Sequence, residues 1–371
     1  MTDAARSDAV VDLAAVRAAD APAVGPKMAR LGQLASTGWR VPDGYAITVG
    51  ALEGWLPATA RSELHRLFSV PATGPASLRL SQQARELIEG QSLPSWLADA
   101  VADAHARLAA RTGRGDALLV AVRSSAVGED GHAASFAGQY ETYLGVSGPD
   151  EVLRHIVKCW ASGYSAHALD YRRRFGGSGP LRAHDLAVGV LELVDARSAG
   201  VAFTLDPVTG DRGRLVVEAN WGLGESVVSG QVTPDYWTVE RDSGRILERR
   251  TGGKLVWSVL ASSGEAGGTV LAPLPAELAQ APCLTDDEVR YICRQAAAIE
   301  AAEGAPQDVE WAIARDLDLP DSVYFLQHRP ETTWASAAPE SGAAPAASPA
   351  AAPAFDPVQY ALRNVFKVPG T

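Results

Sequence analysis

The chain has 371 residues, 47% of them hydrophobic and 21% charged, a mixture typical of globular proteins and not of chains disordered throughout. With 33 Lys and Arg against 44 Asp and Glu, the net charge of −11 disfavours general binding to nucleic acid or to anionic membranes. No apolar run reaches the roughly 18 residues that span a bilayer, and the N-terminus lacks the basic residues of a signal peptide, so we expect a soluble, cytoplasmic protein. At roughly 150 residues per domain, the length predicts about two domains.

The first half of the chain is predicted to mix helices with a few strands. Residues 25–36 start with Gly-Pro-Lys and continue with apolar residues at helical spacing, which predicts a loop that leads into a helix. A Pro-Asp-Gly turn precedes a predicted strand, and residues 51–112 are predicted to be mostly helical. An apolar strand then ends at Arg123, and a loop rich in Gly and Ser separates it from a helix predicted over 150–175.

Strands dominate the second half. They are predicted between 186 and 260 and again over 307–314 and 322–330. Between them, Thr285 lies three residues before Glu288, a capping box that predicts the start of a helix over 286–303. Residues 335–354 form an Ala/Pro/Ser linker predicted to be disordered, and 355–371 form a short apolar tail that docks either on this chain or on a partner. Three cysteines without CxxC spacing predict small buried side chains rather than disulfides or a zinc site.

Two segments of the first half carry groups suited to phosphate. Lys27 stands where a loop enters a helix, so its ammonium can meet phosphate oxygens beside the helix N–H groups. Arg123 stands at a strand end, where its guanidinium offers a rigid fork, and the small residues of 135–139 let backbone amides approach a triphosphate closely. Taken singly, these segments also fit a surface lysine and a hairpin with a Gly bend.

Two segments of the second half extend this pattern. Paired glycines at 222 and 224 suit either close packing or a ligand loop. Glu310 lies on one predicted strand, and Gln327 and Arg329 lie two residues apart on the next, so the last two share a face. A carboxylate and an amide oxygen suit Mg²⁺ on a nucleotide, while the arginine suits phosphate. An exposed strand face with a surface ion pair is the alternative.

Together these segments resemble the nucleotide-binding, ATP-grasp part of phosphoenolpyruvate synthase and pyruvate phosphate dikinase, which is also found in rifampicin phosphotransferase and phenylphosphate synthase. The matching stretches run in family order from about residue 24 to residue 334: GPKMARLGQL and VPDGYAIT, VAVRSSAVGED and ASFAGQYETYLGV, SAGVAFTLDPVTG, VEANWGLGESVVSGQVTPD, and QDVEWAI and VYFLQHRP. The resemblance implies an α+β ATP-grasp fold of two α/β subdomains, 1–185 with a helical insert at about 51–112, and 186–334, with the nucleotide between them.

The resemblance also implies ATP and Mg²⁺ as cofactors and a role for particular residues. Lys27, Arg123 and Arg329 would contact phosphates and act in catalysis, the 135–139 loop would cover the phosphates, and residues 191–194 would form the hinge beside adenine. Glu310 and Gln327 would coordinate Mg²⁺. The implied ATP-binding residues are Lys27, Arg123, Ser135, Gly138, Gln139, Glu192, Leu193, Val194, Glu310, Gln327 and Arg329.

The sequence departs from the family at three places. Pro26 and Met28 flank the loop lysine where glycines are usual, which predicts a stiffer and bulkier loop. Leu191 stands where the family commonly has Gln near adenine, so that side-chain contact is not expected. No implied phosphate or metal ligand is lost, and ATP binding is therefore still expected.

The phosphate acceptor is the remaining question. Enzymes of this family pass phosphate through a histidine in a Gly-rich Thr/Ser-Ser-His-type motif, and none of the seven histidines here has that setting; His167 comes nearest. We therefore expect an ATP-binding subunit that phosphorylates a histidine of a separate protein, with ATP split to AMP and phosphate. That partner would then phosphorylate a small hydroxyl or phenolic acceptor that it holds itself. The alternatives are a self-contained small-molecule kinase and a non-catalytic nucleotide-binding regulator.

Overall fold

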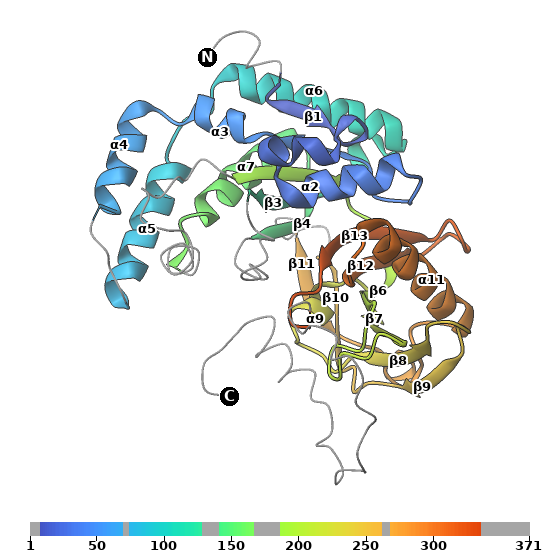
Figure 1. Cartoon of the computed structure of the whole chain (residues 1–371). Helices are drawn as coiled ribbons and strands as arrows, with labels where there is room; N and C mark the ends of the chain where they lie inside the picture. The colour runs from blue at the N-terminus through green and yellow to red at the C-terminus, as the bar shows by residue number, and fades with distance from the viewer. Residues whose placement is uncertain (1–7, 70–73, 128–140, 167–185, 262–267, 335–371) are drawn as a thin grey trace. The chain divides into compact units, whose positions relative to one another are not determined.

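A computed structural model describes residues 8–69, 74–127, 141–166, 186–261 and 268–334 (Figure 1). The predicted linker and tail (335–371), the loop residues Ser135, Gly138 and Gln139, and His167 lie outside these residues. The fold mixes helices with antiparallel sheets, which agrees with the expected α+β class. Within the described residues, no helix is both long enough and apolar enough to cross a membrane.

The described residues form two compact units. The first unit runs to Leu193 and includes Leu260–Thr269, and the second holds the rest from Val194 onward. A two-stranded sheet is formed by β10 and β11, at Val256–Leu260 and Thr269–Pro273.

The first unit is built on a five-stranded antiparallel sheet of order β1-β2-β5-β3-β4. Its strands are β1 (Val10–Asp12), β2 (Gly44–Ile47), β3 (Leu119–Ala126), β4 (Thr142–Ser147) and β5 (Leu186–Glu192). Its α-helices are α2 (Ala21–Ser36), α3 (Val49–Trp55), α4 (Ala58–Leu67), α5 (Pro75–Glu89), α6 (Ser95–Thr112) and α7 (Pro149–Ser162). The predicted helical stretch 51–112 thus contains most of α3 and all of α4, α5 and α6.

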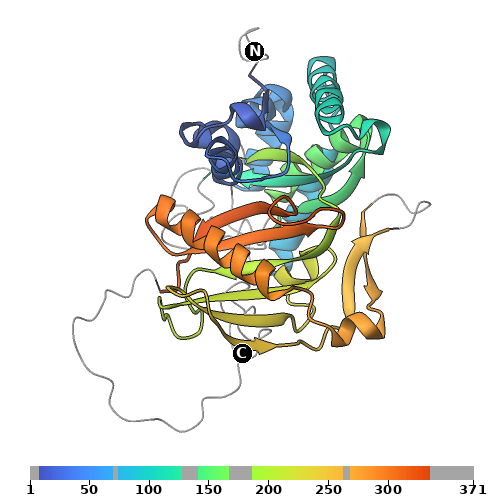
Figure 2. The same ribbon diagram turned by 90° about the vertical axis from the view of Figure 1, so that its right-hand side faces the viewer.

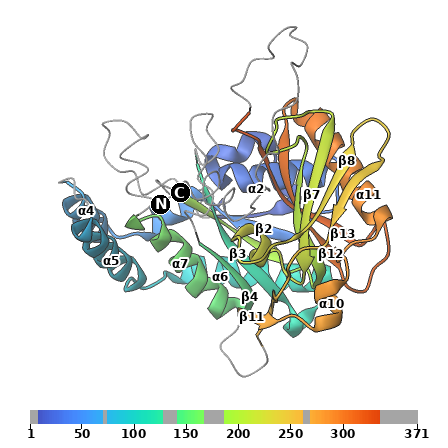
Figure 3. The same ribbon diagram turned by 90° about the horizontal axis from the view of Figure 1, so that it is seen from below.

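The two faces of this sheet are covered by different helices. Tyr45, Val122 and Val190 point into the main core, which α6 and α7 help to close (Figure 3). The opposite face packs against α2, where Met28 and Leu191 belong to a smaller buried cluster. Because side chains alternate along a strand, only every second residue of these strands lies on the face that packs against α2.

Strand β5 lies in the first unit rather than at the start of the second, where the sequence had placed it. It pairs with β2 on one side and β3 on the other, and only Glu192 of its seven residues is not fully buried. A continuous apolar run identifies a strand covered on both faces, but it carries no information about which strands lie beside it.

The second unit is built on a six-stranded antiparallel sheet of order β13-β12-β6-β7-β8-β9. Its strands are β6 (Ala196–Phe203), β7 (Arg214–Trp221), β8 (Asp235–Glu240), β9 (Ile246–Arg250), β12 (Gln307–Ala314) and β13 (Val323–Pro330), and its helices are α9 (Glu225–Val228), α10 (Ala276–Gln280) and α11 (Asp286–Glu303).

Helix α11 covers one face of the six-stranded sheet (Figure 2). It buries Val289, Ile292, Ala296 and Ile299. The capping box predicted at its start is confirmed, because Thr285 Oγ1 accepts the N–H of Glu288 and the Glu288 carboxylate accepts the N–H of Thr285. The three cysteines, Cys159, Cys283 and Cys293, are buried and free, as the sequence predicts.

A buried ion pair ties together three segments of the second unit. Lys254 Nζ lies 2.5 Å from Asp235 Oδ2, and both side chains are fully shielded from solvent. The Asp235 carboxylate also accepts the N–H groups of Gly252 and Cys283, each at 2.8 Å, and Lys254 donates to the carbonyl of Ala281 at 2.7 Å. Both charges are therefore neutralised and hydrogen-bonded, which is the condition under which a protein interior tolerates them.

The first prediction concerns this pair. Lys254→Met should lower the free energy of unfolding by about 3–5 kcal/mol, because it leaves the Asp235 carboxylate buried without its cation. Urea unfolding followed by tryptophan fluorescence measures the change. The control is Arg245→Met, which removes a cation from an exposed ion pair with Glu240 and should change stability by less than about 1 kcal/mol. Equal effects of the two substitutions would contradict the structural role of Lys254.

Candidate nucleotide site

Lys27 follows a sharp interruption at the start of α2. Gly25 has φ 74° and ψ 160°, so regular helix begins only after it. A Cβ on Gly25 would lie 2.2 Å from the carbonyl oxygen of Ser125 at the end of β3, which only glycine avoids. The N–H of Met28 lies 3.4 Å from Ser125 Oγ. The loop that carries Lys27 is therefore held directly against the end of β3.

Arg123 lies two residues earlier on that strand. It pairs with Gly189 of β5, and a Cβ on Gly189 would meet the Met28 sulfur at 2.2 Å, so Met28 packs on the sheet beside Arg123. Burial raises the pKa of the Cys159 thiol, and Lys27 and Arg123 both act against this rise, which places the two cations near one thiol. The start of α2, which carries Lys27, thus packs against the strand that carries Arg123. Met28, one of the departures from the family pattern, is a core residue.

The predicted hinge residues lie where one unit ends and the next begins. The division falls between Leu193 and Val194. Leu191 is only 3% exposed and belongs to the cluster under α2. Glu192 ends β5 and lies 3.5 Å from Arg114; burial raises the pKa of this carboxyl, and the arginine opposes the rise. Backbone hydrogen bonding holds the segment, since Leu193 N–H donates to the Leu119 carbonyl at 2.9 Å.

In the second unit, strand pairing joins the predicted metal residues. Glu310 of β12 lies directly opposite Gln327 of β13, and Asp308 lies opposite Arg329. Arg329 Nε donates to Asp308 Oδ2 at 3.1 Å. Sequence reasoning missed Asp308, although its position two residues before Glu310 on a predicted strand was a signal that both face the same side. Burial raises the pKa of Asp308, and Arg329 opposes this.

One row of directly opposite residues crosses all six strands, and we call it the cross-strand row. Opposite residues of a ladder share a face, so these side chains lie on one side of the sheet. Their neighbours Val309, Ala202, Val217 and Trp237 are buried on the other side, with α11. From β13 to β9 the cross-strand row consists of Gln327, Glu310, Val201, Glu218, Tyr236 and Arg250.

The residues around Glu310 fit a magnesium ion. Asp308 Oδ1 is buried and has no hydrogen-bond partner within the part of the chain that the structure describes. Together with the Glu310 carboxylate and the Gln327 amide oxygen, it gives a hard-oxygen donor set of the kind that Mg²⁺ prefers. The described residues contain no group of three or more His, Cys, Asp or Glu side chains suited to a metal. Two carboxylates suffice for an ion that is also held by phosphates and water.

The glycine pair after β7 serves close packing. Gly222 has φ 77°, and a Cβ there would lie 2.5 Å from the carbonyl oxygen of Ser258. The same carbonyl accepts the N–H of Leu223 at 2.9 Å. Asn220 donates to Ser226 Oγ at 3.0 Å, which fixes the start of α9 against the strand. Of the two alternatives for this segment, these contacts favour packing.

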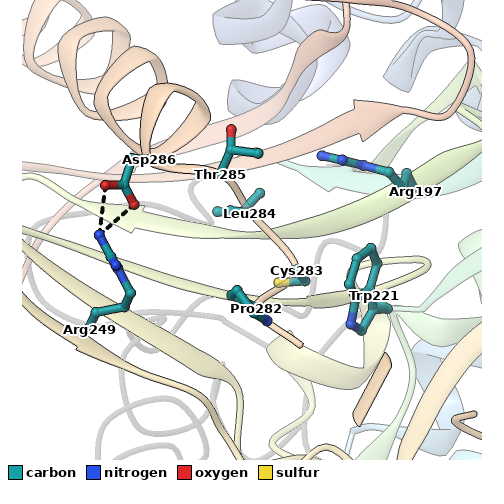
Figure 4. Close-up of a pocket in the computed structure, with 8 residues that line it drawn as sticks. All are labelled: Arg197, Trp221, Arg249, Pro282, Cys283, Leu284, Thr285 and Asp286. Atoms are coloured by element: carbon teal, nitrogen blue, oxygen red, sulfur yellow. Dashed lines mark hydrogen bonds and ion pairs between the residues drawn. The ribbon is translucent and has the colours of Figure 1, made fainter. Parts of the chain in front are cut away.

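A pocket of about 360 Å³ lies at the start of α11 (Figure 4). Two arginines line it, but both are engaged by carboxylates: Arg249 Nη2 lies 2.6 and 2.7 Å from the two oxygens of Asp286, and Arg197 lies 2.6 Å from Glu288. Since α11 packs on the face opposite Glu310, this pocket is separate from the predicted metal residues. Its remaining lining residues are Trp221, Pro282, Cys283, Leu284 and Thr285.

Comparison with known proteins identifies the family. Residues 21–348 match the family described as pyruvate phosphate dikinase, AMP/ATP-binding domain. A probable phosphoenolpyruvate synthase of Methanothermobacter thermautotrophicus is 36% identical over 327 residues, covering 87% of this chain and 46% of the relative. A phosphoenolpyruvate synthase of Aeropyrum pernix is 35% identical, covering 87% and 42%. A rifampicin phosphotransferase of a Streptomyces species is 38% identical, covering 87% and 36%.

The chain spans less than half the length of these relatives. The match nevertheless covers the helices and strands that carry Lys27, Arg123, Glu310 and Gln327. The resemblance read from the sequence motifs is thereby confirmed. This chain belongs to the family of pyruvate phosphate dikinase AMP/ATP-binding domains.

Proposed function

We propose that this protein is the ATP-binding subunit of a dikinase-type phosphotransferase. It uses Mg·ATP to phosphorylate a histidine on a separate partner protein, with ATP split to AMP and phosphate, and the partner then phosphorylates a small hydroxyl or phenolic acceptor. The observation that carries this proposal is the register of β12 and β13, which pairs Glu310 with Gln327 and Asp308 with Arg329. Oxygen donors and the Arg329 guanidinium are thus side by side on a domain whose family binds AMP or ATP.

In this proposal the first unit contributes cations that bind phosphate, and the second contributes metal ligands and one phosphate-binding arginine. Lys27 and Arg123 of the first unit bind phosphate oxygens, a role suited to a point ammonium and a planar guanidinium. Glu310 and Gln327, with Asp308, would hold Mg²⁺, which would neutralise charge on the phosphates. Arg329 binds phosphate and is oriented by Asp308. We further propose the nucleotide position that the resemblance implies for an ATP-grasp fold, between two subdomains, with residues 191–194 beside adenine and residues 135–139 over the phosphates.

We propose a partner because of the sequence settings of the histidines. The 371 residues contain seven, and none lies in a Gly-rich Ser/Thr-Ser-His setting. The phosphorylated histidine is therefore proposed to lie outside these residues, on a separate partner that also holds the acceptor. In transfer, an imidazole nitrogen bonds to the β-phosphorus as its bond to the AMP oxygen breaks, and AMP leaves. Water then cleaves the bond between the β- and γ-phosphoryl groups, which leaves phosphohistidine and releases phosphate.

The second prediction tests the metal residues. In the presence of a partner protein that carries a Gly-rich Ser/Thr-Ser-His motif, Glu310→Ala should lower Mg-dependent turnover of ATP by about 100-fold or more, because a metal contributes several kcal/mol of charge stabilisation to phosphoryl transfer. Unfolding curves should stay close to those of the parent. Glu277→Ala, which removes an exposed carboxylate from α10, is the control and should leave turnover unchanged. Full activity of Glu310→Ala would remove Glu310 from the metal site.

The third prediction concerns Arg123. Arg123→Lys should weaken binding of Mg·AMP-PNP by about 10- to 100-fold, since an ammonium cannot reproduce a bidentate contact with phosphate. Isothermal titration calorimetry measures the dissociation constant. Arg154→Lys changes an exposed arginine of α7 in the same way and should bind like the parent. Parental affinity in Arg123→Lys would place Arg123 outside the site.

The fourth prediction separates this proposal from its alternatives. With β-³²P-labelled ATP and a purified protein that carries a Gly-rich Ser/Thr-Ser-His motif, label should move to that protein and AMP should accumulate. Replacing the motif histidine with alanine should abolish the transfer. Formation of ADP without any partner would favour a self-contained kinase. Tight nucleotide binding without turnover under both conditions would favour a regulatory role.

A further inference from the structure

Glu218 is an acidic residue of the second unit, in the stretch VEANWGLGESVVSGQVTPD, to which the resemblance assigned no role. It lies on β7 in the cross-strand row, separated from Glu310 by one residue, Val201 of β6. Neighbouring strands are about 4.8 Å apart, so the two carboxylate-bearing residues stand roughly 10 Å from each other on the same face. Val201 forms a small apolar floor between them.

The surroundings of Glu218 supply little positive charge. Tyr236 of β8 and Arg250 of β9 continue the row beyond it. The Arg250 guanidinium stacks 4.2 Å from the Tyr236 ring centroid, and its Nε lies 2.9 Å from Glu248.

The other acidic groups near this face are already engaged or lie farther along it. Glu225 of α9 accepts a hydrogen bond from Ser258 at 3.1 Å, and Asp308 and Glu310 lie beyond Val201 on β12. Among the described residues, the Glu218 carboxyl makes neither a hydrogen bond nor an ion pair. Burial raises the pKa of Glu218 to about 7, and Arg250 opposes the rise only in part.

A phosphate chain on this face would lie between two carboxyl groups. On one side, Glu310 shares its charge with Mg²⁺ under the proposed function. On the other side no metal ligand accompanies Glu218, so an ionised carboxylate there would repel the phosphates. A neutral carboxylic acid removes the repulsion and adds an O–H donor, and a half-buried acid can stay neutral near pH 7.

We propose that Glu218 is a phosphate-facing residue of the nucleotide site, which acts as a neutral carboxylic acid and donates a hydrogen bond to a phosphate oxygen of the bound nucleotide. The inference rests on the proposed function, because it takes Mg·ATP as the ligand of this face. It assigns to Glu218 a binding role distinct from the metal role of Glu310.

Nucleotide binding is then linked to a proton. The complex holds Glu218 protonated, so its pKa is higher in the complex than in the free protein. Below about pH 7 the acid is already neutral and affinity is at its maximum. As the pH rises above 7, binding must take up a proton, and affinity falls by up to about tenfold per pH unit.

Calorimetry of Mg·AMP-PNP binding at pH 8, in two buffers of different ionisation enthalpy, counts this proton. Glu218→Gln keeps an N–H donor and loses the titration. The parent should therefore take up close to one proton more than Glu218→Gln, because protonation of the nucleotide itself is common to both. Glu218→Gln should also keep its affinity between pH 7 and 9, whereas the affinity of the parent declines. Glu218→Ala, without a donor, should bind about tenfold more weakly at pH 6.5.

Glu277→Gln is the matched control, since it removes an exposed carboxylate from α10, outside the cross-strand row, and should behave as the parent does. Equal proton uptake by the parent and Glu218→Gln, with both binding nucleotide, would overturn the inference and leave the proposed function intact. A carboxyl ¹³C titration of the parent with Mg·AMP-PNP gives a second measure and must show the Glu218 pKa rising on binding. No binding by the parent would overturn the proposed function and this inference together.

Discussion

The register of the six-stranded sheet is the constraint on which the candidate site depends. Side chains alternate between the two faces of a strand, so a shift of one residue would exchange the faces. Val309, Val217 and Trp237 would then leave the interior, and Glu310 and Glu218 would enter it beneath α11. Each large apolar side chain contributes about 1.5–3 kcal/mol when buried, which far exceeds what the polar face can oppose. The core on one face thus determines where the acidic groups stand on the other.

In the first unit, the close approach of backbone segments determines where the candidate residues stand. Gly25 and Gly189 leave room for Ser125 and for Met28, which lets the start of α2 lie on the sheet beside Arg123. Met28 looked like an obstacle in the sequence because the family usually has glycine there. In the structure its side chain fills the core, and the positive φ of Gly25 turns the backbone into the helix ahead of it.

The start of α11, the polar faces of β12 and β13 and the junction before α2 could be predicted because their signals are local. The capping box of α11, the alternation of β12 and β13 and the Gly-Pro-Lys junction each involve residues within a few positions of one another. Lys254 and Asp235 could not be paired in this way. Their ion pair depends on the path of the chain through β8 and β9, and nothing near either residue identifies its partner.

The sequence by itself determined the family, the mixed helix and sheet composition, and the residue types suited to phosphate and metal, since short motifs carry that information. Only the tertiary structure decided that β5 belongs to the first sheet, that Asp308 orients Arg329, and that Glu218 shares a face with Glu310. The physical reason is that strand partners are chosen by packing between segments far apart in the chain. Alternation within a strand predicts that one face is polar, but not which residues of other strands complete it.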